Sequence, residues 1–172
     1  MSSDKVIEWE GKYLRIARVG TWEFVERCGG VHAVVIFAEH DGKVVLIEQS
    51  RTPLGERKCI ELPAGLVGDE DPNATVEETA IKELEEETGF TAERIEVIGE
   101  FFSSPGMVAE GYTLVRAHGL RRIGEGGGTE HEDIEVHLVA RADIPDFVAR
   151  KRAEGCAIDT KMLLLLASDI LA

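Results

Sequence analysis

Three glutamates in one short segment are the residues best placed to do chemistry in this sequence. Glu83, Glu86 and Glu87 stand at positions i, i+3 and i+4, a spacing that gathers side chains on one side of an α-helix. Like charges this close repel one another, and partial burial adds a desolvation penalty. Divalent cations relieve both effects, and Mg²⁺ prefers carboxylate oxygens together with retained waters. The spacing therefore predicts a site for Mg²⁺, or for Mn²⁺ as a substitute.

The segment around these glutamates has the signals of a helix from Thr75 to Thr88. Thr75 with Glu78 fits a capping box, and Gly89 is a typical helix stop. On a helical wheel, Glu87 falls at the border of the apolar arc that should face the core, which is formed by Ala80, Ile81 and Leu84. The ordinary alternative is a solvated acidic face. That alternative accounts poorly for Glu87.

Strand-forming runs surround this helix and predict an α/β or α+β fold with a mixed sheet. An antiparallel strand pair is expected at the N-terminus, over Tyr13–Val19 and Thr21–Cys28. Asp41-Gly42 is a strong hairpin signal between two β-rich runs, Val31–Glu39 and Lys43–Gln49. Further strands are expected at 59–62, 95–102, 112–117 and 134–140. The other expected elements are a loop containing Gly65 and Gly68, a flexible glycine-rich loop at Gly124–Gly128, and two C-terminal helices near 146–154 and from 159 or 160 onward.

The composition narrows the range of partners. A chain of 172 residues fits one globular domain, and its formal net charge of −14 repels nucleic acid and anionic membranes. The longest apolar run, Met162–Ala167, is far too short to span a bilayer. Cys28, Cys59 and Cys156 are far apart and have neither disulfide-framework nor zinc-site spacing. We therefore expect a cytoplasmic protein that acts on a small molecule, with no nucleic acid or membrane partner.

Two stretches of the sequence resemble a known family. The run Lys82-Glu83-Leu84-Glu85-Glu86-Glu87-Thr88-Gly89-Phe90 resembles the second half of the Nudix box, Arg-Glu-apolar-x-Glu-Glu-x-Gly-apolar. The preceding Glu61-Leu62-Pro63-Ala64-Gly65 resembles the opening of the box in the ADP-ribose pyrophosphatase branch. The resemblance implies a Nudix fold, in which the box packs as loop-helix-loop against a mixed sheet sandwiched between helices. It also implies metal ligands, namely Glu83, Glu86, Glu87 and the backbone carbonyl of Ala64.

The sequence departs from the family pattern at two points. Lys82 stands where the box has an arginine, and lysine lacks the bidentate fork with which arginine orients a carboxylate. The loop from Gly65 to Lys82 is also longer than the family's usual spacing. The first glutamate of the box therefore falls on Ala74, or across an insertion on Glu70 or Asp71. We expect activity to survive both departures.

Features outside the box point to the substrate. Ser104-Pro105-Gly106-Met107, with Glu110 shortly after it, resembles an element of the ADP-ribose pyrophosphatases. Trp22 and Arg27 resemble an N-terminal strand whose tryptophan stacks on adenine and whose arginine helps to hold the substrate. Stacking alone does not separate adenine from guanine. The resemblance therefore implies a substrate-binding set that includes Pro105, Gly106, Met107 and Glu110.

The element Glu48-Gln49-Ser50-Arg51 resembles the family's Glu-Gln-aromatic-Arg, with Ser50 in place of the aromatic residue. Arg51 is a candidate clamp for a diphosphate, because guanidinium groups match phosphate oxygens bidentately. Glu61 is a candidate for recognising a hydroxyl group of the substrate. Glu130 and Glu132 follow the glycine-rich loop, where the branch has its catalytic base, and Glu132 is slightly favoured.

These features together predict Mg²⁺-dependent hydrolysis of a nucleotide sugar, with ADP-ribose first and AMP and ribose 5-phosphate as products. GDP-mannose or another nucleotide sugar is the alternative substrate, and a catalytically silent nucleotide-binding module is the alternative from another class. The branch's habit also implies a homodimer. Residues 1–28 would then form a strand region for dimerisation and substrate contact, and residues 29–172 the Nudix hydrolase domain.

Overall fold

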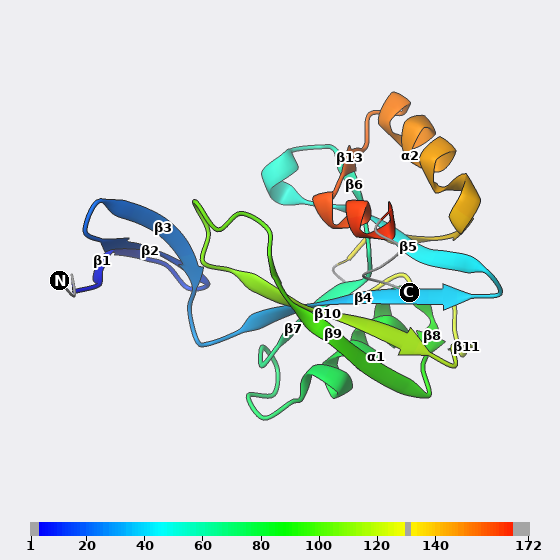
Figure 1. Ribbon diagram of the computed structural model, residues 1–172, viewed down its shortest axis with the longest axis horizontal. Coiled ribbons are helices and arrows are strands. Elements are labelled where there is room, and N and C mark those ends of the chain that lie inside the picture. The colour runs from blue at the N-terminus through cyan, green and yellow to red at the C-terminus, as the bar shows by residue number, and fades with distance from the viewer. Residues whose placement is uncertain (1–3, 130–131, 167–172) are drawn as a thin grey trace.

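The computed structural model describes residues 4–129 and 132–166, and its centre is a mixed sheet (Figure 1). The strand order is β13-β6-β5-β4-β10-β9, with β12 paired to β5 and β7 paired to β4. Two of the pairings, β10 with β4 and β13 with β6, are parallel. The strands are β4 (His32–His40), β5 (Lys43–Ser50), β6 (Lys58–Glu61), β7 (Ala64–Val67), β9 (Arg94–Phe102), β10 (Gly111–His118), β12 (Ile134–Ala140) and β13 (Ala157–Ile158).

The predicted hairpin shapes this sheet. Asp41 and Gly42 both have positive φ, 49° and 71°, as a two-residue hairpin turn requires. Only Glu39–Val44 and His40–Lys43 then pair across the hairpin. Beyond that point β5 turns to β6 and β12, while β4 continues against β10 and β7. β4 and β5 therefore diverge after the turn and pair with different strands.

Helices cover both faces of the sheet, as predicted (Figure 1). Alternate residues of β4 divide between two cores, because side chains alternate across a strand. Val34 and Ile36 pack with Ala80 and Leu84 of α1 (Val76–Thr88). On the other face, buried side chains of β4 and β5 pack with those of α2 (Ile144–Ala153) and of η3 (Thr160–Leu166), including Phe147, Met162 and Leu165. The predicted fold class is confirmed.

The N-terminal sheet has three antiparallel strands, in the order β1-β2-β3. The predicted pair corresponds to β2 (Leu14–Val19) and β3 (Trp22–Arg27), and the prediction missed β1 (Val6–Glu10). Every residue of β1 is exposed, so the strand lacks the buried face that makes a strand recognisable in sequence. Val25 of β3 donates to the Met107 carbonyl and accepts from the Ala109 amide, at 2.9 and 2.8 Å. These bonds join the sheet to the β9–β10 loop.

One predicted element was wrong in kind. The segment from Gly65, predicted as a loop, is strand through Val67 because β7 pairs with β4. The last predicted helix is present from Thr160 to Leu166 as the 3₁₀ helix η3. The structure also adds short elements, β8 (Phe90–Thr91) paired with β11 (Arg121–Arg122), η1 (Thr52–Leu54) and η2 (Arg141–Asp143). In the described ranges, no helix has the length and apolar character needed to cross a membrane.

The glycine-rich loop predicted to be flexible is bonded to the end of α1. The amides of Gly127 and Gly128 donate to the carbonyls of Glu87 and Glu86, at 2.9 and 3.0 Å. The last carbonyls of a helix lack intrahelical partners, so the loop satisfies two of them. Gly126 has φ of 74°, and a Cβ there would overlap the backbone carbonyl carbon of Thr88. The glycines therefore allow the loop to lie directly against α1.

We predict that Gly126→Ala destabilises the protein by about 1–3 kcal/mol more than Gly30→Ala, because added atoms in a packed site force backbone shifts. Gly30 is the matched control, since it has the same φ of 74° but no atom within 4 Å of the place that a Cβ would occupy. Urea unfolding of both variants measures the difference. Equal losses in the two variants would mean that the close approach to α1 has no energetic weight.

Candidate functional site

The predicted start and end of α1 are confirmed. Thr75 Oγ1 accepts from the Glu78 amide at 3.2 Å, and Glu78 Oε2 accepts from the Thr75 amide at 2.9 Å. Gly89 ends the helix in the left-handed conformation, with its amide donating to Glu85 O at 3.0 Å. These caps set where the helix begins and ends. Because Ala80 and Leu84 pack in the core, the side of α1 that carries Glu83 and Glu87 lies against β7.

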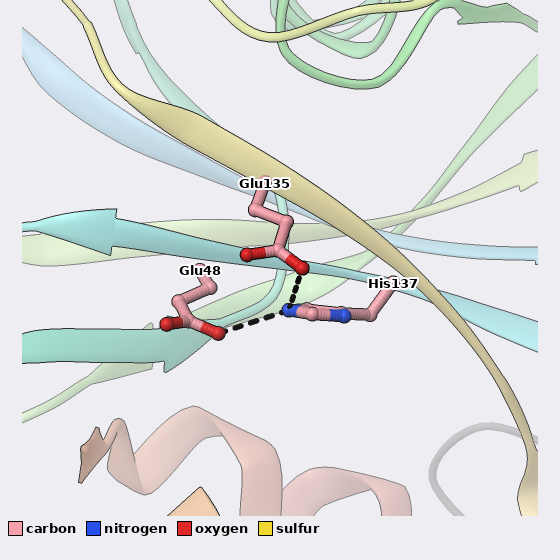
Figure 2. A group of neighbouring side chains, drawn as sticks. All are labelled: Glu48, Glu135 and His137. Carbon is pink, nitrogen blue, oxygen red and sulfur yellow. Dashed lines mark hydrogen bonds and ion pairs between the residues drawn. The ribbon is translucent and has the colours of Figure 1, made fainter. Parts of the chain in front are cut away.

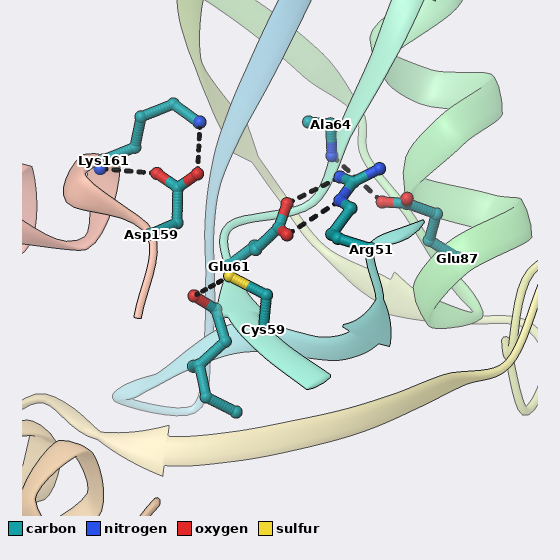
Figure 3. A network of polar contacts seen from close by, with 8 residues as sticks. Arg51, Cys59, Glu61, Ala64, Glu87, Asp159 and Lys161 are labelled. Atoms are coloured by element: carbon teal, nitrogen blue, oxygen red, sulfur yellow. Dashed lines mark hydrogen bonds and ion pairs between the residues drawn. The ribbon is translucent and has the colours of Figure 1, made fainter. Parts of the chain in front are cut away.

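Glu87 is the most buried of the predicted ligands, with 3% of its surface exposed. Its Oε2 accepts a hydrogen bond from the Ala64 amide at 3.0 Å (Figure 3). Burial nevertheless raises the pKa of Glu87 to about 8, with Glu83 adding to the rise. A single amide thus offsets only part of the desolvation cost of this carboxylate.

Glu83 lies over the backbone of β7 at Gly65. A Cβ at Gly65 would overlap the Glu83 carboxyl group, so the glycine leaves room for this position of the Glu83 side chain. Burial raises the pKa of Glu83 to about 7, and Glu86 adds to the rise. The carboxyl groups of Glu83 and Glu87 are therefore buried near other carboxylates, and the protein alone does not neutralise their charge.

Lys82 contacts Glu86 and Glu70. Its Nζ lies 3.2 Å from Glu86 Oε2 and 2.9 Å from Glu70 Oε2. Of the positions that the sequence left open for the first glutamate of the box, Glu70 is the one that pairs with Lys82. The longer loop thus places the carboxylate of Glu70 beside Lys82, the residue that stands where the box has an arginine.

The donor set on α1 and β7 suits a hard divalent cation. It consists of carboxylates and a backbone carbonyl, which are the ligands that Mg²⁺ takes in proteins. Glu83 and Glu87 have pKa values raised by burial and by neighbouring carboxylates, which a dication would reverse. In the described part of the chain, these glutamates do not form a trio with oxygens all within 4.8 Å of one another. Their oxygens are therefore not all as close together as the ligand atoms of the polar cluster at Glu48.

A cleft of about 630 Å³ opens beside these carboxylates. Thr129 and Glu132, which follow the glycine-rich loop, also line this cleft. Glu132 Oε2 accepts from the Thr129 amide at 2.9 Å and from its hydroxyl at 3.1 Å. The structure thus brings Glu132 to the same cleft as the predicted metal ligands. The other predicted base, Glu130, lies outside the described residues.

A second cavity, of about 410 Å³, adjoins the acidic cleft, and Arg51 and Ala64 line both. Arg51 makes a bidentate pair with Glu61, with nitrogen–oxygen distances of 2.8 and 2.6 Å (Figure 3). The sequence predicted separate roles for these two residues, and their pairing was not foreseen. Two guanidinium N–H groups are used in this pair, which leaves others to face a ligand.

The second cavity contains some of the predicted substrate residues. Arg27 and Glu110 form an ion pair on its wall. Asp159 and Lys161, which carried no predicted role, also line it and contact each other at 2.6 Å (Figure 3). Within the described chain, neither cavity is lined by the other predicted contacts, Trp22, Pro105, Gly106 and Met107. Trp22 is 62% exposed on the N-terminal sheet.

A further polar cluster was missed by the sequence analysis. Glu48, Glu135 and His137 have ligand atoms within 4.8 Å of one another, the only such trio among the described residues (Figure 2). Glu48 Oε2 also lies 2.7 Å from Lys151 Nζ. Burial favours a raised pKa for Glu48, but the hydrogen bonds from Lys151 and His137 outweigh it and lower the pKa. An ammonium group thus already compensates the charge that a cation would neutralise.

Comparisons with known proteins agree with this geometry. The model of the NUDIX domain family matches residues 29–155. The chain is 40% identical to the methanol dehydrogenase activator of Bacillus methanolicus over 118 residues, which are 68% of this chain and 60% of the activator. It is 43% identical to the ADP-ribose pyrophosphatase of Bacillus subtilis (strain 168) over 51% of this chain and 44% of that protein. The chain therefore spans less than two thirds of both relatives.

Another relative is matched over more of its length. The GDP-mannose pyrophosphatase of Cronobacter sakazakii is 34% identical over 84% of this chain and 74% of that protein. The crystal structure of an ADP compounds hydrolase superposes with a TM-score of 0.72 at 20% identity, covering 98% of this chain and 92% of the other, and shows the same fold. Since the family model covers most of the chain and its glutamates converge on one cleft, the protein belongs to the Nudix family.

Proposed function

We propose that the protein hydrolyses the pyrophosphate bond of a nucleoside diphosphate sugar in a Mg²⁺-dependent reaction, with ADP-ribose as the leading substrate. The observation that carries this proposal is the junction of two cavities at Arg51. One cavity is acidic and suited to dications, and the other has the size of a small-ligand site. A diphosphate at the junction would place its phosphorus atoms beside the carboxylates and its nucleoside or sugar in the adjoining cavity.

Glu83, Glu86, Glu87 and the Ala64 carbonyl would hold the ions. Ions bound there would neutralise the anionic diphosphate and make water at the site more acidic. The remaining N–H groups of Arg51 would bind phosphate oxygens, while the bidentate pair with Glu61 orients the guanidinium. The rigid pairing of Arg51 orients the reacting bond within the cleft.

Glu132 is our proposed general base. Glu132 lines the same cleft as Glu87, and its carboxylate accepts hydrogen bonds from Thr129. Breaking two hydrogen bonds to a neighbouring residue would free it to take a proton from the attacking water. Glu130 is the second candidate for the general base, supported by the sequence resemblance alone.

The substrate has two candidates because relatives with both names resemble this chain, an ADP-ribose pyrophosphatase and a GDP-mannose pyrophosphatase. Mass analysis of products after incubation with each compound, with and without Mg²⁺, tests the proposal. We expect AMP and ribose 5-phosphate from ADP-ribose, formed only with the metal. Binding of both compounds without any hydrolysis would instead establish the silent module.

Glu87→Gln should reduce turnover by about 100-fold or more, because a ligand supplying several kcal/mol of charge stabilisation is lost. The amide has nearly the shape of the carboxyl group, so the variant should fold normally. Glu85→Gln is the control, since it removes one charge from the same helix at a position that does not line either cavity. Steady-state rates with Mg²⁺ measure both variants, and a wild-type rate for Glu87→Gln would contradict the metal assignment.

The metal-free protein should become less stable as pH rises from about 4.5 to about 8. The folded chain retains protons on Glu83 and Glu87, whose pKa values are about 7 and 8, at pH values where the unfolded chain has released them near 4.5. Melting temperatures in EDTA across this range measure the slope. Mg²⁺ should restore stability at the upper end, and Glu87→Gln should flatten the metal-free profile. A flat wild-type profile would contradict the burial of these groups.

We further propose a homodimer in which residues 1–28 pack on a partner and help to complete its site. Large apolar side chains are exposed along the N-terminal sheet, namely Val6, Ile7, Trp9, Leu14, Ile16 and Trp22. Exposed apolar groups gathered in one place mark interaction sites. Trp22 lies away from both cavities of its own chain, so a contact with substrate would have to come from the partner. We place this protein in the cytoplasm because its cysteines are unpaired.

Ile16→Lys should convert the dimer to a monomer of 18.9 kDa in light scattering, because dimerisation would bury the lysine's charge in the interface formed by the N-terminal sheet. Leu138→Lys is the control, as Leu138 is similarly exposed at 38% but lies on β12. A wild-type protein that scatters as a monomer would end the dimer proposal.

A further inference from the structure

Gln49 has a buried amide group without a partner. The residue is 5% exposed, and its Nε2 is the one buried side-chain nitrogen or oxygen in the described chain that makes no hydrogen bond. Buried polar groups in folded proteins are nearly always paired, and an exception calls for an explanation. A partner that arrives with a ligand is one such explanation.

The sheet directs this side chain toward the acidic cleft. Gln49 is two residues from Ile47 and four from Val45, and Val45 packs in the core on the α1 face. Its register partners are Cys59 on β6 and Ile134 on β12. Gln49 accordingly lines the cleft that holds the α1 carboxylates. The neighbouring Glu48 points to the opposite face, toward His137 and Lys151.

The charges around Gln49 determine what could pair with it. Two basic side chains line the cleft, Arg51 and Lys82, and both are held by carboxylates. The other charged lining residues are all acidic: Asp69, Glu70, Asp71, Glu78, Glu83, Glu86, Glu87 and Glu132. When ions occupy Glu83, Glu86 and Glu87, a bound diphosphate would bring further acceptor oxygens into the cleft that Gln49 lines.

We propose that Gln49 is a substrate-binding residue whose Nε2–H donates to a non-bridging oxygen of the bound diphosphate. This inference rests on the function proposed above. A neutral amide suits the place, because a further lysine would form an ion pair with one of the acidic groups and compete with the metal for it. Rotation about the last side-chain bond is soft, so the amide turns toward a phosphate without a shift of β5.

Two variants of nearly the same shape test this role. Gln49→Met removes the donor, and Gln49→Glu removes the donor and adds a negative charge that repels phosphate. We expect KM, and the Kd of a non-hydrolysable methylene-diphosphonate analogue of the best substrate, to rise about tenfold in Gln49→Met. Both constants should rise further in Gln49→Glu. Ser50→Ala, a change on the opposite face of the same strand, should leave both constants unchanged.

Melting temperature separates this role from a structural one. Gln49→Met should melt at the wild-type temperature or above it, because it removes an unpaired buried polar group. Weaker analogue binding by such a stable variant supports the inference. Unchanged analogue binding, a fall in kcat alone, or a lower melting temperature that accounts for the weaker binding would each overturn it. If the wild type hydrolyses no nucleotide sugar, the proposed function has failed, whereas an active wild type with normal Gln49 variants refutes only this inference.

Discussion

The constraint on which the rest of the structure depends is the placement of carboxylates against the backbone of β7. Glu87 is buried with one amide as its partner, and Glu83 occupies space that a side chain at residue 65 would overlap. Neither arrangement lowers the free energy of the metal-free chain, since both desolvate a charge beside another charge. The desolvation of these carboxylates would be offset if a cation bound between them. The packing of Ala80 and Leu84 in the core and the bonds from the glycine-rich loop hold α1 in the position that keeps these carboxylates against β7.

A chain with a net charge of −14 needs local positive groups in order to bind an anion. The long-range field of the protein opposes the approach of a diphosphate. Attraction therefore has to be local, and the groups available for it in the described chain are few. Arg51 stands at the junction of the two cavities with its guanidinium held by Glu61. Because the Glu61 pair orients the guanidinium beforehand, little conformational entropy would be lost in the proposed binding of a phosphate.

Local signals made the helix, its caps and the Asp41-Gly42 hairpin predictable, because each depends on residues within a few positions of one another. Long-range pairing was not predictable in the same way. The bidentate contact of Arg51 with Glu61 depends on the register of β5 against β6. The ion pair of Lys82 with Glu70 depends on the path of an irregular loop. β1 escaped notice because it has no buried face, and β7 because its short glycine-containing sequence resembles a loop until β4 supplies a partner.

The segment Glu48-Gln49-Ser50-Arg51 shows how one strand can serve both layers of the fold. Side chains alternate across a strand, and the extended backbone of Arg51 continues that alternation one residue past β5. Glu48 therefore meets Lys151 and His137 on the α2 face, whereas Gln49 and Arg51 reach the cleft on the other. A shift of register by one residue would exchange the two faces. The buried pairing of Glu48 opposes that shift, so a contact remote from the carboxylates of α1 keeps Gln49 and Arg51, the groups proposed to bind diphosphate, on the cleft side.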